Sequence, residues 1–155
     1  MRARRRDSKA RGRSPGCKLF YSNPFGLSGF GKFFPRALDY LLSHDLQANA
    51  AACGEIIIGG LKEAAKGLKT VADVRGKGLM FAVDMADPAT GKPAPALAAK
   101  VLEACKKRGL LVGKGGLYGA TLRMAPPLTL TQDEALEGLG LLVDALTYVD
   151  NGMAG

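Results

Sequence analysis

Residues 71–85, VADVRGKGLMFAVDM, decide the fold class of this 155-residue chain. Apolar and β-branched residues dominate Val71–Val74 and Gly78–Met85, which predicts two strands. The segment between them, Arg75–Gly78, contains two glycines, and glycine permits the backbone conformations of a tight turn. The stretch therefore predicts an antiparallel hairpin against which the remaining elements must pack.

Helical periodicity lies on both sides of this hairpin. Apolar residues from Leu38 to Leu61 recur at steps of three and four. This spacing predicts one long amphipathic helix from Arg36 to about Gly67. The same spacing predicts a second helix over Ala96–Arg108, which Gly109 is well placed to end.

Two further strands and a last helix complete the pattern. Leu110–Val112 is predicted as a short apolar strand, Gly113–Gly119 as a flexible loop, and Thr121–Ala125 as a strand stopped by a proline pair. Thr131, with Glu134 three residues later, predicts a capping box at the start of the final helix. The order of elements predicts an α+β fold, a mostly antiparallel small sheet with helices on one face.

The positive charge of the chain is concentrated at its N-terminus. The net charge is +8, and residues 1–18 contain eight basic residues against the single acid Asp7. The remaining residues are nearly neutral overall, so nucleic-acid binding by the folded part is not expected. We assign residues 1–35 to a basic, loop-rich segment in which Asn23–Gly31 is loop-like, and residues 36–155 to the folded domain.

Three interpretations of this basic segment remain open. An arginine-rich, acid-poor start with interspersed serines is typical of an organelle transit peptide, which would place the protein in mitochondria. A disordered tail and translation outside the true reading frame explain the same composition. Without import, a cytoplasmic location is expected.

Several classes of site are not expected. No apolar run approaches the roughly 20 residues that a membrane-spanning helix needs. Cys17, Cys53 and Cys105 are odd in number and widely spaced, and His44 is the single histidine. These counts argue against a disulfide framework and against a zinc or other metal site. His44 lies inside a polar helical stretch with Asp45 and is interpreted as a surface residue.

The glycine-rich loop Gly113–Gly119 does not fit a nucleotide site. A dinucleotide loop would need glycine where Tyr118 stands, and a phosphate-binding P-loop would be followed by a helix rather than by a strand. We interpret the segment as a flexible turn between strands. Arg75, in the predicted hairpin turn, is interpreted as a donor that stabilises that turn.

Arg123 is the best candidate for a site residue. Strand alternation over residues 121–125 puts Leu122 and Met124 on one face and Arg123 on the other. An arginine in the middle of a strand presents a planar fork that can bind a carboxylate through two hydrogen bonds. A solvated or salt-bridged sheet arginine is the alternative that the residues alone leave open.

Three motifs resemble class III pyridoxal-phosphate aminotransferases. They are residues 71–80, VADVRGKGLM; residues 109–113, GLLVG; and residues 122–128, LRMAPPL. Residues 112–119, VGKGGLYG, are most similar to the type-2 alanine–glyoxylate aminotransferases. The resemblance covers about residues 36–149, with the motifs in order and the expected helix between them.

The resemblance implies a fold and a role for Arg123. Family members are fold-type I enzymes in which a large domain carries pyridoxal 5′-phosphate and a small C-terminal domain, matching this chain, closes over it. The arginine that matches Arg123 binds the substrate α-carboxylate. The implied reaction transfers an amino group between an amino acid and a 2-oxo acid such as glyoxylate or pyruvate, in a homodimeric parent enzyme.

The chain also departs from the family pattern. No lysine has the setting of the cofactor-binding lysine: Lys77 and Lys114 belong to small-domain motifs, and Lys32 stands in an unmatched segment. Ser22–Pro24 only faintly resembles a family motif expected before the long helix. The expectation is a fragment, a truncated gene model or a remnant with a replaced start, inactive alone and without a catalytic or cofactor-binding residue of its own.

Two alternatives stand beside this interpretation. The chain could be a non-catalytic α+β module that binds a small acid or associates with full-length aminotransferase subunits. Nucleic-acid binding through the basic tail is the weaker alternative.

Overall fold

The computed structural model describes residues 28–152, with side chains from residue 35, and the chain divides into two units between His44 and Asp45. The first unit contains helix α2, Ser28–Ser43, and the second contains all the other elements. α2 begins within the segment expected to be loop-rich, and Pro35 lies inside it. The features expected in residues 1–27 lie outside the described residues.

The expected single helix over residues 36–67 is wrong, because two helices occupy this stretch. The second of them, α3, spans Leu46–Ala65. Between the two helices, Asp45 adopts a left-handed conformation with φ 47° and ψ 45°, which aspartate tolerates better than most residues. The Nδ1 atom of His44 lies 3.0 Å from the Tyr40 carbonyl oxygen. Polar side chains that bond nearby backbone groups compete with continued helix, and apolar periodicity cannot reveal this competition.

Four antiparallel strands form one sheet in the second unit. They are β1, Val71–Lys77; β2, Met80–Met85; β3, Gly113–Gly115; and β4, Thr121–Met124. Their spatial order is β1-β2-β4-β3. Every neighbouring pair is antiparallel, so the predicted α+β sheet is confirmed.

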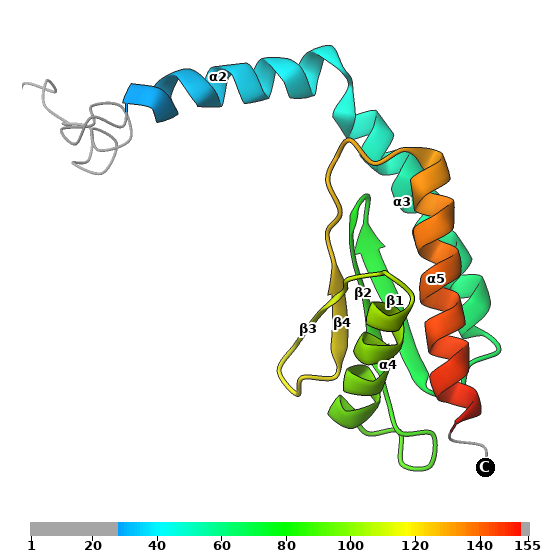
Figure 1. Ribbon diagram of the computed structural model, residues 1–155. Helices are drawn as coiled ribbons and strands as arrows, with labels where there is room; N and C mark the ends of the chain where they lie inside the picture. The colour runs from blue at the N-terminus through cyan, green and yellow to red at the C-terminus, as the bar shows by residue number, and fades with distance from the viewer. Residues whose placement is uncertain (1–27, 153–155) are drawn as a thin grey trace, which may run out of the picture. The chain divides into compact units, whose positions relative to one another are not determined.

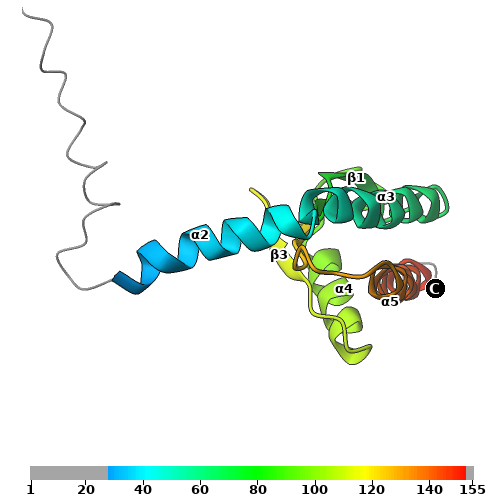
Figure 2. The same ribbon diagram turned by 90° about the horizontal axis from the view of Figure 1, so that it is seen from above.

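Helices cover one face of this sheet (Figure 1). They are α3; α4, Pro95–Lys107; and α5, Gln132–Asn151. α5 contacts both α3 and α4, and the view from above shows α3 and α5 side by side (Figure 2). α4 agrees with the expected Ala96–Arg108 to within one residue at each end.

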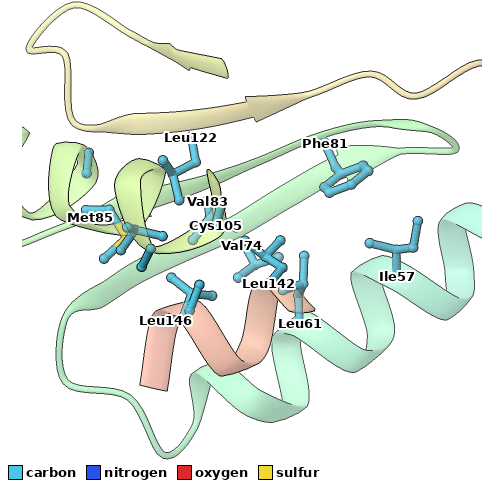
Figure 3. Packing of buried hydrophobic residues seen from close by; sticks show 14 of the residues in the cluster. Ile57, Leu61, Val74, Phe81, Val83, Met85, Cys105, Leu122, Leu142 and Leu146 are labelled. Carbon is cyan, nitrogen blue, oxygen red and sulfur yellow. The ribbon is translucent and has the colours of Figure 1, made fainter. Parts of the chain in front are cut away.

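The core lies between the sheet and these helices (Figure 3). Buried side chains from the sheet face buried side chains of α3 and α5, and α4 closes one end. Burial of this apolar surface is the main term that stabilises the fold. The largest fully buried apolar side chains belong to Leu61, Val83, Met85, Val101, Leu122 and Leu146.

The hairpin turn lies further along the chain than the predicted turn, Arg75–Gly78. β1 continues to Lys77, which pairs with Met80, so the turn consists of Gly78 and Leu79. Gly78 has φ 55°, a value that glycine adopts without strain. α3 approaches this turn closely: a Cβ atom added at Gly54 would lie 2.4 Å from the Gly78 carbonyl oxygen. The hairpin therefore packs directly against backbone of α3.

The third strand also differs from its prediction. Leu110–Val112, expected as a strand, has no ladder partner, and β3 instead occupies the first three residues of the expected loop. The reason is local, because the backbone N–H of Leu110 donates to the Cys105 carbonyl oxygen at 3.0 Å in the C-terminal turn of α4. Leu110 and Val112 pack on the core, whereas Leu111 is exposed.

The last helix begins as predicted. The Thr131 N–H donates to a Glu134 carboxylate oxygen at 2.8 Å, and the Glu134 N–H donates to the Thr131 hydroxyl at 3.3 Å. The capping box is therefore confirmed. Hydrogen bonds from the Thr131 N–H and then from its hydroxyl, the latter at 2.9 Å, lower the pKa of Glu134 below its ordinary value, because they favour the charged carboxylate.

Candidate functional site

Two rows of residues cross the face of the sheet that is turned away from the helices, called here the outer face. One row joins Arg75, Ala82 and Arg123 on three neighbouring strands. The next row joins Asp73, Asp84 and Thr121 in the same way. Their strand neighbours Val74, Val83 and Leu122 are buried on the helical face, so alternation puts both rows on the outer face.

Arg123 is exposed in the middle of β4. Within residues 28–152 its guanidinium has no hydrogen bond or ion pair to another side chain. It lies over strand β3: a Cβ atom added at Gly115 would lie 3.2 Å from the Arg123 Cδ and 3.7 Å from one of its terminal nitrogens. The missing side chain at Gly115 therefore provides the room in which the guanidinium lies.

An ion-pair cluster fills the part of the outer face beside Arg123. Arg75 contacts the Asp84 carboxylate through both terminal nitrogens and also donates to Asp73 at 3.0 Å. The Thr121 hydroxyl donates to Asp84 at 2.6 Å. The hydrogen bonds from Arg75 lower the pKa of Asp84 below its ordinary value, outweighing burial, and the bond from Thr121 lowers it further.

Arg75 therefore differs from its predicted role as a turn donor. It lies within β1 rather than in the turn, and its partners are two carboxylates rather than turn backbone. Its hydrogen bonds to Asp84 and then to Asp73 raise the pKa of Arg75 above its ordinary value, so the charge is permanent. The charge of Arg75 is thus paired with carboxylates of the sheet, whereas that of Arg123 has no carboxylate partner within the described residues.

The other predicted residues, His44, Cys53 and Cys105, do not belong to the sheet. His44 is exposed, stacked on the Tyr40 ring with 3.9 Å between ring centroids. Cys53 and Cys105 are free and buried, and burial raises the pKa of the Cys105 thiol. Among residues 28–152, no three His, Cys, Asp or Glu side chains are grouped to hold a metal ion. No helix of that range is long and apolar enough to cross a membrane.

A pocket of about 300 Å³ reaches β4 at Arg123 but belongs to the helical face. Its apolar walls come from α3, α5, the end of β4 and residues 110–113. Met124, which lines it, is packed on the core. Because Arg123 points to the opposite face, the pocket meets the strand behind the guanidinium. The carboxylate-binding candidate is therefore the outer face and not this pocket.

The sequence of the chain is similar to those of known proteins. Residues 32–146 match the model of the class III aminotransferase family. The chain belongs to the class III aminotransferase family. It is 34% identical over 130 residues to alanine–glyoxylate aminotransferase 2 homolog 2, a mitochondrial protein of Arabidopsis thaliana, covering 83% of this chain and 26% of that one. It is also 34% identical over 109 residues to an alanine/serine racemase of Pyrococcus horikoshii, covering 70% and 23%.

Solved structures of class III aminotransferases and related enzymes show the same fold. A phospholyase from Arthrobacter in complex with phosphoethanolamine superposes with a TM-score of 0.69 at 34% identity, covering 72% of this chain and 26% of that one. A Bacillus anthracis aminotransferase superposes with a TM-score of 0.67 at 30% identity, covering 73% and 26%. The chain thus spans about a quarter of the length of the relatives that it matches.

Class III aminotransferases use pyridoxal phosphate, and a related amine transaminase was solved with it bound as an internal aldimine. A lysine that forms a Schiff base is usually activated by desolvation or by a neighbouring cation. Every lysine between residues 35 and 152 is exposed. The side chains of this range do not fit an attachment site for the cofactor.

Sequence reasoning found Arg123 but missed the cluster beside it. The signal was present in β2, where Ala82 and Asp84 alternate with the buried Val83 and Met85. This alternation puts Asp84 on the same face as Arg123. The partner of Asp84 could not be identified without the register of β1 on β2, and the displaced turn obscured that register.

Proposed function

We propose that this chain is the small domain of a class III aminotransferase, in which Arg123 binds the α-carboxylate of the substrate. The observation that carries the proposal is an exposed guanidinium that has no side-chain partner within the described residues, on a sheet face where Asp73 and Asp84 already bond Arg75. A cation without a protein partner can accept a carboxylate from solution. Arginine suits this task because its planar fork forms two parallel hydrogen bonds with a carboxylate.

The chemistry of transamination explains why one fixed cation is useful. An amino acid and the 2-oxo acid derived from it share the α-carboxylate, and only the substituent on the adjacent carbon changes. A guanidinium held on a rigid strand can therefore keep both molecules in one register relative to the reacting carbon. Pyridoxal phosphate, when bound in the parent enzyme, supplies the electron sink for the reaction.

Small 2-oxo acids such as glyoxylate and pyruvate are the proposed substrate class. Support comes from the alanine–glyoxylate aminotransferases among the relatives, including the human mitochondrial protein at 32% identity. Other relatives are named for 4-aminobutyrate and 5-aminovalerate, so family membership alone does not fix the substrate. All of these acids have a carboxylate, but in 4-aminobutyrate and 5-aminovalerate methylene groups separate it from the amine-bearing carbon.

Titration of the purified chain with pyruvate tests this proposal, with the backbone amide NMR signals of β3 and β4 as the readout in every variant. We expect these signals to shift saturably in the parent chain and binding to be lost in Arg123→Gln. Arg123→Lys should bind pyruvate more weakly than the parent chain, because the lysine ammonium is a point charge and lacks the planar fork of the guanidinium. Arg36→Gln, which removes another exposed arginine, is the matched control and should bind like the parent chain. Equal binding in Arg123→Gln and the parent chain would contradict the proposal.

We also propose import into mitochondria, supported by the arginine-rich start and by relatives named as mitochondrial. A fluorescent protein fused after residue 35 should accumulate in mitochondria, and replacing the arginines of residues 1–18 with glutamine should abolish this. Diffuse fluorescence from the unaltered fusion would refute import.

A further inference from the structure

The Asp84 carboxylate lies on the same sheet face as Arg123 and is bonded by Arg75 and Thr121. We propose that Arg75 and Thr121 are positioning residues that occupy the carboxylate of Asp84, which would otherwise pair with Arg123 and compete with the substrate. This inference deepens the proposed function, since it rests on Arg123 binding a carboxylate. It gives a role at the site to an ion pair that would otherwise only stabilise the sheet.

The sheet register puts Asp84 between two arginines. Asp84 is opposite Asp73 on β1 and opposite Thr121 on β4. Arg75 and Arg123 each stand two residues further along those strands, so each is a diagonal neighbour of Asp84 on the same face. Diagonal neighbours in an antiparallel sheet lie about 7–8 Å apart, within reach of a long side chain. By position alone, either arginine could pair with this carboxylate.

The hydrogen bonds resolve this choice in favour of Arg75. One carboxylate oxygen of Asp84 accepts from Thr121 at 2.6 Å and from Arg75 at 3.1 Å, and the other accepts from Arg75. Arg75 and Thr121 thus bond both oxygens of Asp84, and the single positive charge of Arg75 is shared between Asp84 and Asp73. A carboxylate whose two oxygens are already bonded in this way has few lone pairs left to accept hydrogen bonds from a second guanidinium.

Gly115 completes the arrangement from the opposite side. The Arg123 side chain lies across β4 over Gly115 on β3, whereas Asp84 lies on the β2 side of the same strand. A methyl group at position 115 would be 3.2 Å from the Arg123 Cδ, which is tighter than normal packing. Two features therefore keep Arg123 apart from Asp84. Arg75 and Thr121 already bond the Asp84 carboxylate, and Gly115 on β3 leaves room for the Arg123 side chain on the other side of β4.

Loss of Arg75 has a definite physical consequence. The freed Asp84 carboxylate becomes an intramolecular ligand for Arg123, and an intramolecular ligand competes at a high effective concentration. A small acid from solution must then displace it. The hydrogen bonds from Arg75 and then from Thr121 lower the pKa of Asp84, so these two groups hold the carboxylate in its charged form.

The test compares the parent chain with Arg75→Gln and with the double variant Arg75→Gln/Asp84→Asn. In Arg75→Gln we expect the Arg123 Nε–H NMR signal to shift and to follow the protonation of Asp84, and the affinity for pyruvate to fall about three- to fivefold, the size of an exposed ion pair. In the double variant the remaining acid of the cluster, Asp73, lies on β1, which is not adjacent to β4, so Arg123 should regain the parent signal and affinity. This rescue separates competition from general damage to the sheet.

Two outcomes overturn the inference: an Arg123 signal unmoved by Arg75→Gln, or a double variant as weak as the single one. Should Arg75→Gln fail to fold, Arg75→Lys, which keeps the charge but loses the fork, is measured in the same way. If the parent chain binds no pyruvate, the proposed function fails. The response of the Arg123 signal to Arg75→Gln then still decides the positioning role.

Discussion

Arg123 and Arg75 show how two identical side chains on one sheet face differ through their neighbours. Both are exposed residues of the outer face, in one register row on either side of Ala82. Arg75 is bonded to two carboxylates, whereas Arg123 has no protein partner among the described residues. The sequence identifies both arginines but not the distribution of acids between them, because that depends on the pairing of three strands.

The stability of the chain should depend on pH through Asp84. Its pKa in the folded protein lies below the ordinary value of 3.8. The stabilisation that ionised Asp84 provides is therefore complete above the pKa of Asp84 in the unfolded chain. It is lost as the pH falls through the pKa of Asp84 in the folded protein. We expect the free energy of unfolding, measured by urea denaturation, to be lower at about pH 3 than near neutral pH.

Arg75→Gln should remove most of the Asp84 contribution, so this variant should lose less stability on acidification than the parent chain. Arg36→Gln, which leaves Asp84 untouched, should show the full parental loss. An identical acid dependence in Arg75→Gln and the parent chain would mean that the ion pair does not stabilise the fold.

At the scale of elements, the close contact between α3 and the β1–β2 turn depends on one glycine. Gly54→Ala would put a methyl group 2.4 Å from the Gly78 carbonyl oxygen, so backbone must move. Overpacking of this kind typically destabilises by about 1–3 kcal/mol. We expect a lower midpoint of thermal unfolding for this variant.

Gly59→Ala, in the same helix, is the control, because a Cβ atom there would meet no other atom within 4 Å. Alanine favours helix over glycine by about 1 kcal/mol, so this variant should be more stable than the parent chain. Destabilisation by both variants would show that α3 tolerates alanine at neither glycine. The loss of stability in Gly54→Ala could then not be assigned to the close approach of Gly54 to Gly78.

The sequence predicts elements well where periodicity and capping agree. α4 begins and ends close to its predicted limits and α5 begins where predicted, because a glycine follows α4 and a capping box starts α5. The break at Asp45 and the strand β3 were missed. Both are decided by interactions with backbone carbonyl oxygens, made by the His44 ring at Tyr40 and by the Leu110 N–H at the end of α4, which leave no trace in hydrophobic spacing.

On the scale of the whole second unit, one hydrogen-bonded pair joins its last helix to its first strand. Thr70, fully buried just before β1, donates its N–H at 2.8 Å and its hydroxyl at 2.7 Å to Asp150 near the end of α5. Buried donors without a partner are costly. This pair therefore fixes two segments that are 80 residues apart in the sequence.

Asp150→Ala should leave both Thr70 donors without an acceptor and lower the free energy of unfolding by about 1–3 kcal/mol. Chemical denaturation measures the loss. Asp144→Ala, which removes an exposed acid from the same helix, should change stability little. Equal losses in the two variants would indicate a general effect of helix charge rather than the buried pair.

The strand order leaves β1 and β3 at the two margins of the sheet, and neither margin suits the addition of a foreign strand. β3 is only three residues long and has the charged Lys114 at its centre. β1 changes register between Val71 and Asp73 and ends at Lys77. Short, irregular and charged margins discourage amyloid-like stacking of chains. This domain should therefore resist aggregation through strand pairing even at the high concentrations that spectroscopy requires.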